Sequence, residues 1–420
     1  MKYVIEGGKS LSGIVDISGS KNAALPVLCA TVINGGKNVI RNCPNISDVR
    51  DMCRLLRDIG CSVKKEGSTI TVNSSEADGK KLNGETIKKI RSSITLMGAV
   101  AGRFGSFSAA KPGGCVIGKR PVDIHINALK SLGAEVEEKY DEIKISAQKL
   151  KGGIINMPFP SVGATENAMM AAVFAEGKTV IVNSAREPEI ICLQNFLKTI
   201  GVKIFGAERG YIVVEGCKKF NNSDFEIIYD RIEAGTFLCS AAMCRGDVFL
   251  KNAPWREMTA VLEALSQTGC EIYACQKGIW ILAEKRLKNI YALSTGVYPL
   301  FPTDMQPLFT AMLTRAKGKS IIVETVFEKR MGYVDELKKF GADISCSDRV
   351  CVVKGVKCLK GTSVYAKDLR AGACLINAAL SAEGESTVYG SEFVRRGYEN
   401  IEKKLALLGA KIRLEKDVVI

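Results

Sequence analysis

The chain has 420 residues, of which 46% are hydrophobic and 25% are charged, a globular balance that excludes a disordered or fibrous protein. This length exceeds the usual size of a single hydrophobic core, so we expect two domains. The net charge of +14 favours anionic partners, such as nucleic acid or a small substrate that carries several phosphates.

The N-terminal segment, residues 1–8, predicts a strand followed by a turn, and it lacks the apolar core of a signal peptide. Along the sequence, no apolar run reaches the roughly 18 residues that a membrane-spanning helix needs. The longest candidate, residues 23–33, is too short and contains Pro26. The sequence therefore predicts a cytoplasmic protein that has no membrane partner.

The cysteine and histidine content argues against a metal site. The 15 cysteines form no Cys-x-x-Cys motif, and the sequence has a single histidine. The tightest cysteine pairs, such as Cys239/Cys244 and Cys346/Cys351, lie in apolar or strand-like segments. We therefore expect reduced thiols in a reducing compartment, and neither a metal nor a cofactor.

One short pattern recurs six times along the chain: Leu, two residues, a bulky residue or Thr, Gly, two residues, then Val or Ile. Its glycines are 68 to 73 residues apart. Each occurrence predicts a helix that ends at a left-handed glycine and is followed at once by a strand. After the first glycine, a Glu-Gly pair predicts that the strand turns back as a hairpin. The six glycines are Gly60, Gly133, Gly201, Gly269, Gly341 and Gly409.

A second landmark keeps the same period. Small or polar residues precede an apolar helical stretch at intervals of 67 to 72 residues, and each predicts the start of a second helix. Repeats of this size are small subdomains, and three per domain place the boundary near Tyr229. Helix N-termini that face a common cleft would bind anionic ligands. The predicted starts are Asn22, Ser92, Ala164, Ala234, Asp304 and Ala371.

The segment from Lys111 to His125 carries the most specific chemistry. Three glycines and two prolines in its first eleven residues predict a loop. Cys115 lies among Lys111, Lys119 and Arg120, and nearby cations stabilise a thiolate. Cys115 is therefore the candidate reactive thiol, and the alternative is a plain glycine-rich surface loop. We expect His125 to brace local structure, the alternative being a contact with substrate.

Charged and polar side chains stand at several predicted helix starts. Lys21 and Asn22 open the first helix and Asp304 opens the fifth, although a carboxylate at such a position is most often only an N-cap. Three further segments supply guanidinium groups, which suit bidentate binding of phosphate or carboxylate unless they are solvated surface charges. These segments are Arg91-Ser92-Ser93, Asp368-Leu369-Arg370 and Arg395-Arg396-Gly397-Tyr398.

With these motifs, the whole chain resembles the UDP-N-acetylglucosamine 1-carboxyvinyltransferase family of enolpyruvyl transferases. The resemblance implies two similar α/β domains, each an inside-out barrel of three repeats, with the active site in the cleft between them. Residues 21–228 would form the N-terminal domain, and residues 1–20 plus 229–420 the C-terminal domain. The matching stretches are Ser18–Pro26, Pro112–Cys115, Arg120–Asp123, Ser161–Asn167, Ala185–Ile190, Phe301–Gln306 and Asp368–Arg370.

The reaction that the resemblance implies is the first committed step of peptidoglycan synthesis. The enolpyruvyl group of phosphoenolpyruvate would pass to the 3′-hydroxyl of UDP-N-acetylglucosamine, with release of phosphate. Cys115 would protonate the methylene carbon, Asp304 would take the proton of the hydroxyl, and Asn22 would position that hydroxyl. Phosphoenolpyruvate would be held by Lys21, Arg120 and Arg396. The nucleotide sugar would be held by Arg91, Arg120, Pro121, Val122, Asp123, Ile124, Ser161, Val162, Gly163, Val326 and Leu369.

Two positions depart from the family pattern: Arg395 stands where aspartate is usual, and Lys329 where asparagine is usual. One rival function is the shikimate-pathway enolpyruvyl transferase, which shares the fold and reaction type but lacks the Cys115 loop. Another is an RNA-binding or RNA-end-processing protein with related repeats, which only the net charge favours. Aromatic residues are 7% of the chain and do not interleave with basic residues as in base-stacking surfaces, so we expect no nucleic-acid partner.

Overall fold

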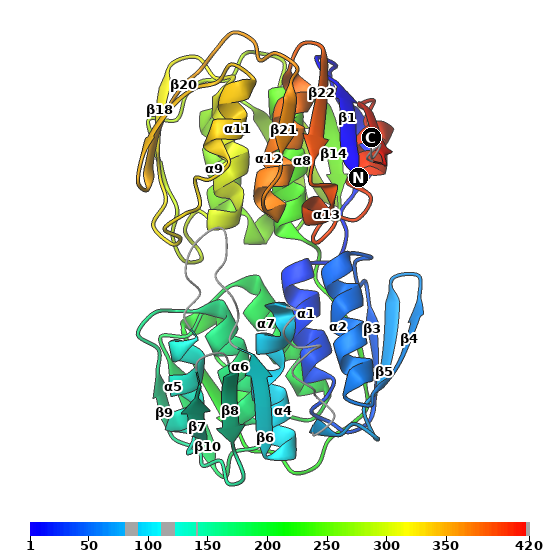
Figure 1. The fold of residues 1–420 in the computed structure, drawn as a ribbon, viewed down its shortest axis with the longest axis vertical. Coiled ribbons are helices and arrows are strands. Elements are labelled where there is room, and N and C mark those ends of the chain that lie inside the picture. The colour runs from blue at the N-terminus through cyan, green and yellow to red at the C-terminus, as the bar shows by residue number, and fades with distance from the viewer. Residues whose placement is uncertain (80–90, 111–121, 140–141, 417–420) are drawn as a thin grey trace. The chain divides into compact units, whose positions relative to one another are not determined.

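The computed structural model describes residues 1–79, 91–110, 122–139 and 142–416, with the side chains of all of these except 91–93 and 109–110. The chain divides into two compact units (Figure 1). The N-terminal unit holds the described residues between Gly19 and Ile228. The C-terminal unit combines Met1–Ser18 with the described residues from Tyr229 onward. The loop predicted around Cys115, with Arg120 and Pro121, lies outside the described residues.

Three sheets form the outside of the N-terminal unit. In its two four-stranded sheets, one edge pair is parallel and the other pairs are antiparallel. The third sheet is antiparallel in its described strands. In spatial order, the first sheet contains β13 (Ser223–Glu226), β3 (Lys37–Arg41), β5 (Thr69–Asn73) and β4 (Ser62–Glu66). The second contains β11 (Ile204–Phe205), β12 (Tyr211–Glu215), β10 (Lys178–Val182) and β9 (Ile154–Asn156). The third contains β6 (Ser106–Ala110), β8 (Glu142–Ser146) and β7 (Glu135–Glu138).

The C-terminal unit repeats this plan and includes the start of the chain. The strand predicted at the N-terminus is confirmed, because β1 pairs with β22 and β23, and β2 pairs in parallel with β14. In spatial order, its first sheet contains β21 (Ser363–Tyr365), β22 (Glu385–Tyr389), β1 (Lys2–Glu6) and β23 (Lys411–Glu415). The second contains β15 (Glu271–Cys275), β16 (Gly278–Leu282), β14 (Asp247–Lys251) and β2 (Ser12–Asp16). The third contains β17 (Ala292–Ser294), β18 (Lys319–Val323), β20 (Val350–Lys354) and β19 (Asp343–Ser347).

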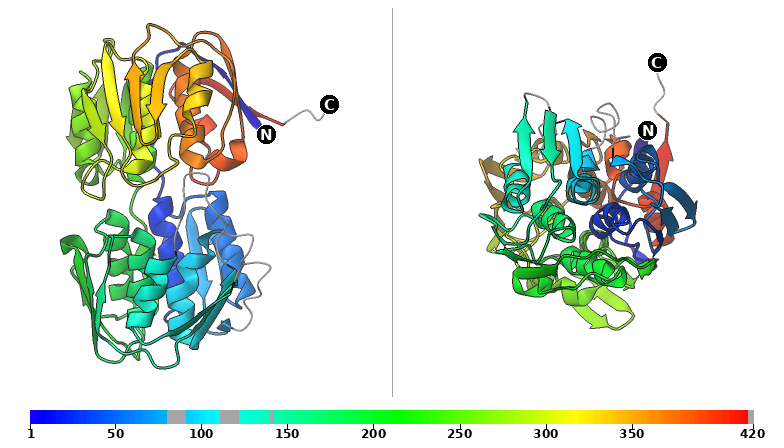
Figure 2. Two further views of the ribbon diagram at one scale, coloured as in Figure 1. Left: turned by 60° about the vertical axis from the view of Figure 1, so that its left-hand side comes forward. Right: turned by 90° about the horizontal axis from the view of Figure 1, so that it is seen from below.

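Apolar helices lie inside each unit and the sheets lie outside them (Figure 2). Every residue of α8 and α10 is buried, as expected for a helix that is enclosed on all sides. This arrangement confirms the predicted α/β fold class with helices inside sheets. The helices are α1 (Lys21–Ala30), α2 (Ser47–Asp58), α4 (Met97–Phe104), α5 (Asp123–Ser131), α6 (Val162–Ala172), α7 (Pro188–Thr199), α8 (Arg231–Met243), α9 (Thr259–Gln267), α10 (Gln306–Leu313), α11 (Val334–Lys339), α12 (Leu369–Ser381), α13 (Ser391–Val394) and α14 (Ile401–Leu407).

The six repeated glycines end six helices, as predicted. Their φ angles lie between 85° and 97°, a left-handed conformation that a side chain would strain. They follow α2, α5, α7, α9, α11 and α14, and each leads directly into a strand. The predicted hairpin is confirmed as well, since β4 and β5 pair antiparallel around Gly67.

Four of the six predicted helix starts lie among the first four residues of an α-helix, in α1, α6, α8 and α12. Side chains at the N-cap confirm the local logic: Ser161 accepts from the Ala164 amide at 3.4 Å, and Asp368 accepts from the Arg370 amide at 2.9 Å. Ser92 and Asp304 instead lie in short 3-10 turns, Arg91–Leu96 and Thr303–Met305, which lead into α4 and α10.

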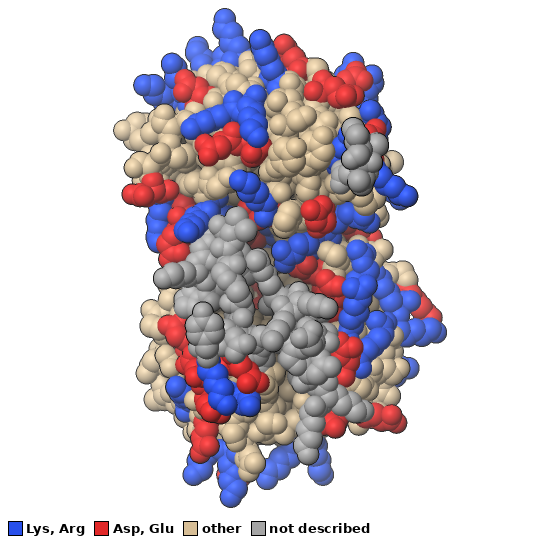
Figure 3. All heavy atoms as spheres, viewed as in Figure 1, with Lys and Arg blue, Asp and Glu red and all other residues tan. Residues whose placement is uncertain are grey.

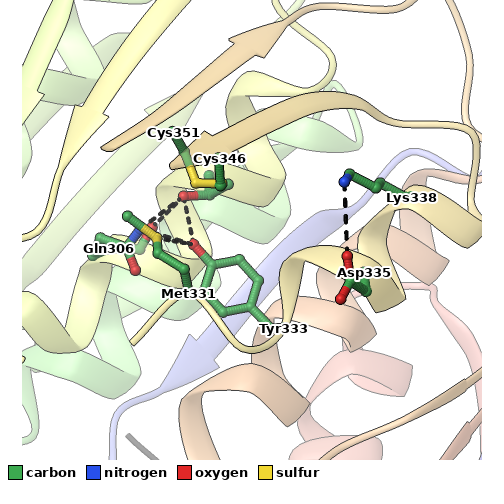
Figure 4. Close-up of a disulfide and its surroundings, with 8 residues drawn as sticks. Gln306, Met331, Tyr333, Asp335, Lys338, Cys346 and Cys351 are labelled. Atoms are coloured by element: carbon green, nitrogen blue, oxygen red, sulfur yellow. Dashed lines mark hydrogen bonds and ion pairs between the residues drawn. A yellow bond between two sulfur atoms is a disulfide. The ribbon is translucent and has the colours of Figure 1, made fainter. Parts of the chain in front are cut away.

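The prediction of reduced thiols is wrong for one pair, because Cys346 and Cys351 form a disulfide (Figure 4). The two residues face each other across the antiparallel strands β19 and β20, with their Cα atoms 4.1 Å apart. Hairpin pairing brings directly opposite side chains this close, and sequence spacing alone does not reveal the register.

Candidate functional site

A carboxylate held between two buried arginines is the main polar feature of the C-terminal unit. Asp304 accepts from Arg330 Nη2 at 2.8 Å through one oxygen, and from Arg370 Nη2 at 2.9 Å and Nε at 3.2 Å through the other. The arginine side chains are 3% and 4% exposed, whereas that of Asp304 is 28% exposed. The carboxylate is therefore the part of this cluster that solvent or a ligand can reach.

The two arginines set the protonation state of Asp304. Burial by itself would raise the pKa of this carboxyl, but the charges of Arg370 and Arg330 hold that pKa far below its usual value. Arg231 lowers it further. Asp304 is consequently an anion at any physiological pH.

The alternative interpretation of Asp304, as only an N-cap, is wrong. The N-cap position of α10 is Met305, and no side chain caps that helix. The start of α10 is instead anchored by Gln306, whose Nε2 donates to the hydroxyl of Tyr333 at 2.8 Å (Figure 4). The Asp304 carboxylate is thus available for the arginines rather than for the helix backbone.

The starts of three buried helices contribute to this cluster. Arg231 opens α8, Asp304 lies two residues before the start of α10, and Arg370 is the second residue of α12. Arg370 also donates to the hydroxyl of Tyr398 at 3.1 Å, which in turn lies 2.8 Å from the hydroxyl of Thr236 on α8. Helix N-termini carry partial positive charge, so their convergence adds to the attraction for an anion.

In the N-terminal unit, the predicted ligand Lys21 forms an ion pair that the sequence did not reveal. Its Nζ lies 2.8 Å from Asp48 Oδ2, and the two side chains are 11% and 8% exposed. Lys21 opens α1 behind the N-cap Ser20, whereas Asp48 lies in the first turn of α2. Asn22 follows Lys21 and is half-buried.

The structure brings two predicted substrate-binding stretches together through His125. Val122 precedes α5, which begins with Asp123 and Ile124, while Ser161 caps α6, which begins with Val162 and Gly163. The buried ring of His125 packs on α6, since a Cβ at Gly163 would approach its Cε1 to 3.0 Å. The expectation that His125 braces local structure is confirmed, although it lies in a helix rather than in the loop.

Asn167 defines the proton position on this histidine. Its Oδ1 accepts from the Gly98 amide at 2.6 Å, so its Nδ2 is the atom that faces His125 Nδ1 at 2.9 Å. Because an amide nitrogen can only donate, Nδ1 must accept and the neutral ring carries its proton on Nε2. Burial lowers the pKa of His125 to about 4, while Asp123 acts weakly in the opposite direction.

We predict that His125 stays neutral down to unusually low pH. As the sequence has one histidine, its imidazole proton resonances can be followed without assignment, and their midpoint should lie near pH 4 instead of the ordinary 6.5. The buried, neutral ring makes its full contribution to the free energy of unfolding above pH 6.5. Because the pKa of His125 is lower in the folded than in the unfolded protein, this contribution is lost as pH falls from 6.5 toward 4. By pH 5, urea unfolding of wild type should have lost about 2 kcal/mol relative to His125→Gln. A midpoint near 6.5 would show an exposed ring.

The remaining predicted site residues lie at the following positions. Arg91 opens a 3-10 turn, and its side chain lies outside the described part of the chain, as do Cys115, Arg120 and Pro121. Arg396 follows α13 and is half-buried, whereas Arg395 is exposed and donates to Met1 Sδ at 3.5 Å. Val326 follows β18, and Leu369 is the first residue of α12.

Sequence reasoning missed Arg330 and Asp48, and it named Arg370 only as one of several guanidinium groups suited to binding phosphate or carboxylate. Arg370 lies in the matching stretch Asp368–Arg370, which marked it in the sequence. Only their charge marked Arg330 and Asp48. Among the described residues, no group of three or more His, Cys, Asp and Glu side chains could hold a metal ion, and no helix is both long and apolar enough to cross a bilayer.

The basic side chains do not gather in one patch on the face shown in Figure 3. Lys and Arg are spread over both units there, with Asp and Glu between them. A nucleic-acid surface would instead concentrate cations along one stripe.

Comparisons with known proteins agree over nearly the whole chain. A family model described as EPSP synthase (3-phosphoshikimate 1-carboxyvinyltransferase) matches residues 5–405. UDP-N-acetylglucosamine 1-carboxyvinyltransferase 2 of Caldanaerobacter subterraneus subsp. tengcongensis is 45% identical, covering 98% of this chain and 99% of the relative. UDP-N-acetylglucosamine 1-carboxyvinyltransferase 1 of Symbiobacterium thermophilum is 42% identical, covering 98% and 94%.

Solved structures show a similar fold. The enolpyruvyl transferase NikO from Streptomyces tendae matches with a TM-score of 0.88 at 24% identity, covering 98% of both chains. EPSP synthase from Acinetobacter baumannii matches with a TM-score of 0.72 at 19% identity, covering 99% of this chain and 100% of the other.

Proposed function

This chain belongs to the EPSP synthase family of enolpyruvyl transferases, and on that premise we propose that it transfers the enolpyruvyl group of phosphoenolpyruvate to the 3′-hydroxyl of UDP-N-acetylglucosamine, with release of phosphate. The acceptor is the one named in relatives that are 45% and 42% identical. This reaction would commit the sugar to peptidoglycan synthesis.

The observation that carries the proposal is the arginine-held carboxylate of Asp304. Protonation of the methylene carbon of phosphoenolpyruvate turns the neighbouring carbon into an oxocarbenium-like centre, which the sugar hydroxyl attacks. Once the new C–O bond forms, the attacking oxygen becomes strongly acidic. A carboxylate of low pKa can then accept its proton, because it need only be a stronger base than the neutral ether oxygen that is left behind.

The leaving group and the proton donor need side chains of their own. Phosphate leaves as a dianion while the new methyl group returns one proton to the conjugate base of the acid that supplied it, which restores the double bond. The leaving dianion needs cationic stabilisation, for which we propose Lys21, Arg120 and Arg396. We propose Cys115 as the acid that protonates the methylene carbon, and Asn22 as the group that positions the hydroxyl. These assignments follow the family motifs at each of these positions.

We propose that the nucleotide sugar binds at the starts of α5 and α6. His125 holds these two starts together, and free amide groups in a first helical turn are suited to anionic oxygens. The ligands there would be Val122, Asp123, Ile124, Ser161, Val162 and Gly163, with Arg91, Arg120, Pro121, Val326 and Leu369 completing the set.

The proposal is tested by measuring phosphate release from phosphoenolpyruvate with each of two acceptors. We expect release with UDP-N-acetylglucosamine and none above background with shikimate 3-phosphate. Release with shikimate 3-phosphate alone would make the shikimate-pathway reaction correct. No release with either acceptor, together with salt-sensitive binding of RNA, would favour the nucleic-acid alternative.

A further inference from the structure

A buried carboxylate that is not among the predicted site residues connects two segments of the candidate site. Glu324 directly follows β18 and is 1% exposed. Its Oε2 accepts from the hydroxyl of Thr303 at 2.9 Å, and its Oε1 accepts from the amides of Val326 at 2.8 Å and Phe327 at 3.0 Å. Three donors on one buried carboxylate form a well-satisfied network.

The partners of Glu324 are neighbours of the residues that hold the charge cluster. Thr303 directly precedes Asp304 in the same 3-10 turn. Phe327 lies in the segment that leads to Arg330, and the Arg330 guanidinium stands 5.7 Å from the Phe327 ring centroid. One side chain thus connects the segment of the carboxylate with the segment of its arginine partner.

The backbone around Glu324 is itself anchored. Its amide donates to the Arg349 carbonyl at 2.8 Å. The next residue, Thr325, donates its amide to Thr295 Oγ1 at 2.8 Å and its hydroxyl to the Thr295 carbonyl at 2.8 Å. Glu324 is therefore a fixed point, from which its carboxylate can define the positions of Thr303, Val326 and Phe327.

We propose that Glu324 is a positioning residue for the proposed enolpyruvyl transfer, on which this inference rests. It acts through the Thr303 hydroxyl on Asp304, and through the Val326 and Phe327 amides on the segment that carries Arg330. It does not touch the substrate. Displacing a catalytic group by about 1 Å can cost on the order of a hundredfold in rate, so loss of such a tether should appear in kcat.

The sharpest test removes only the Thr303 hydroxyl. Thr303→Val should lower kcat about tenfold, with KM for both substrates within about threefold of wild type, because the ligands of both substrates are intact. Thr303→Ser restores the hydroxyl and should recover most of the loss. Thr199→Val is a matched control, since it removes hydroxyl contacts to Phe196 and Ser223 in the N-terminal unit and should keep wild-type kcat.

A double-mutant cycle distinguishes positioning from a general structural effect. If Thr303 acts through Asp304, Thr303→Val should have little further effect on kcat in an Asp304→Asn background. Equal fold losses in both backgrounds would overturn the proposal. A wild type without turnover would refute the proposed function together with the kinetic inference, whereas an active wild type with unchanged Thr303→Val refutes the inference alone.

Variants of Glu324 test the tether independently of activity. Glu324→Gln can still accept from both amides and can donate its amide to the Thr303 oxygen, so kcat should stay within about threefold of wild type. Glu324→Leu should lose at least about tenfold, and hydrogen exchange at the Val326 and Phe327 amides should accelerate in it by a similar factor. Unchanged exchange in a folded Glu324→Leu protein would show that the carboxylate does not hold these amides.

Discussion

Asp304→Asn should lower turnover by at least about a hundredfold, the usual contribution of a positioned general base. Asparagine has nearly the shape of aspartate and can still accept from one arginine, but it cannot take the proton of the attacking hydroxyl. Binding of UDP-N-acetylglucosamine, measured by calorimetry, should change far less than kcat, because its proposed ligands lie mainly at other positions. This contrast separates loss of chemistry from loss of binding.

The structure changes what the same variant should do to stability. An N-cap aspartate could be replaced by asparagine at little cost, but Asp304 neutralises two buried arginines. Leaving them uncompensated should destabilise the protein by on the order of 3 kcal/mol. Glu233→Gln is the matched control, since Glu233 pairs with Lys404 at 2.9 Å in the same unit and has no proposed role in the reaction.

Both variants should therefore unfold earlier than wild type, and only Asp304→Asn should lose kcat per folded molecule. If the two retain equal kcat, Asp304 is a structural counter-ion and another base is needed. Asp368 is a poor substitute, because its Oδ1 already caps α12 by accepting from the amides of Arg370 and Ala371.

Cys115→Ser should lose most product formation, whereas Cys115→Asp should retain a measurable part of it. A serine hydroxyl is too weak an acid to protonate carbon at neutral pH, while a carboxylic acid can donate a proton. In wild type, an epoxide phosphonate of the fosfomycin type should alkylate Cys115 first and stop turnover at one label per chain. Peptide mapping by mass spectrometry after partial inactivation measures both.

Burial limits how many of the described thiols could compete with Cys115 for the epoxide. Burial raises the pKa of most described cysteines, for example to about 12 for Cys61 and Cys244, which makes their thiolates scarce at neutral pH. Of the described free cysteines, Cys275 is exposed, and Cys217 and Cys358 are half-buried. Labelling of Cys275 in proportion to inactivation, with Cys115 unmodified, would contradict the assignment, and Cys275→Ser should leave inactivation unchanged.

The sequence by itself determined the repeat architecture, because each repeat is marked by local chemistry. A glycine such as Gly60 or Gly341 ends its helix because only glycine adopts φ near 90° without strain. A serine or aspartate such as Ser161 or Asp368 begins a helix because its side chain satisfies free amides in the first turn. These signals depend on residues a few positions apart, so spacing along the chain was enough to place them.

Only the tertiary structure decided which charges and thiols meet. Asp304 looked like a helix cap, but Arg330 and Arg370 reach it from 26 and 66 residues away. The partner of Lys21, the disulfide between Cys346 and Cys351 and the donors to Glu324 likewise depend on how helices and strands pack. Ion pairs and hydrogen bonds require atoms within about 3 Å. Local sequence patterns do not specify distances between segments that are far apart in the chain, since these are set by the packed cores.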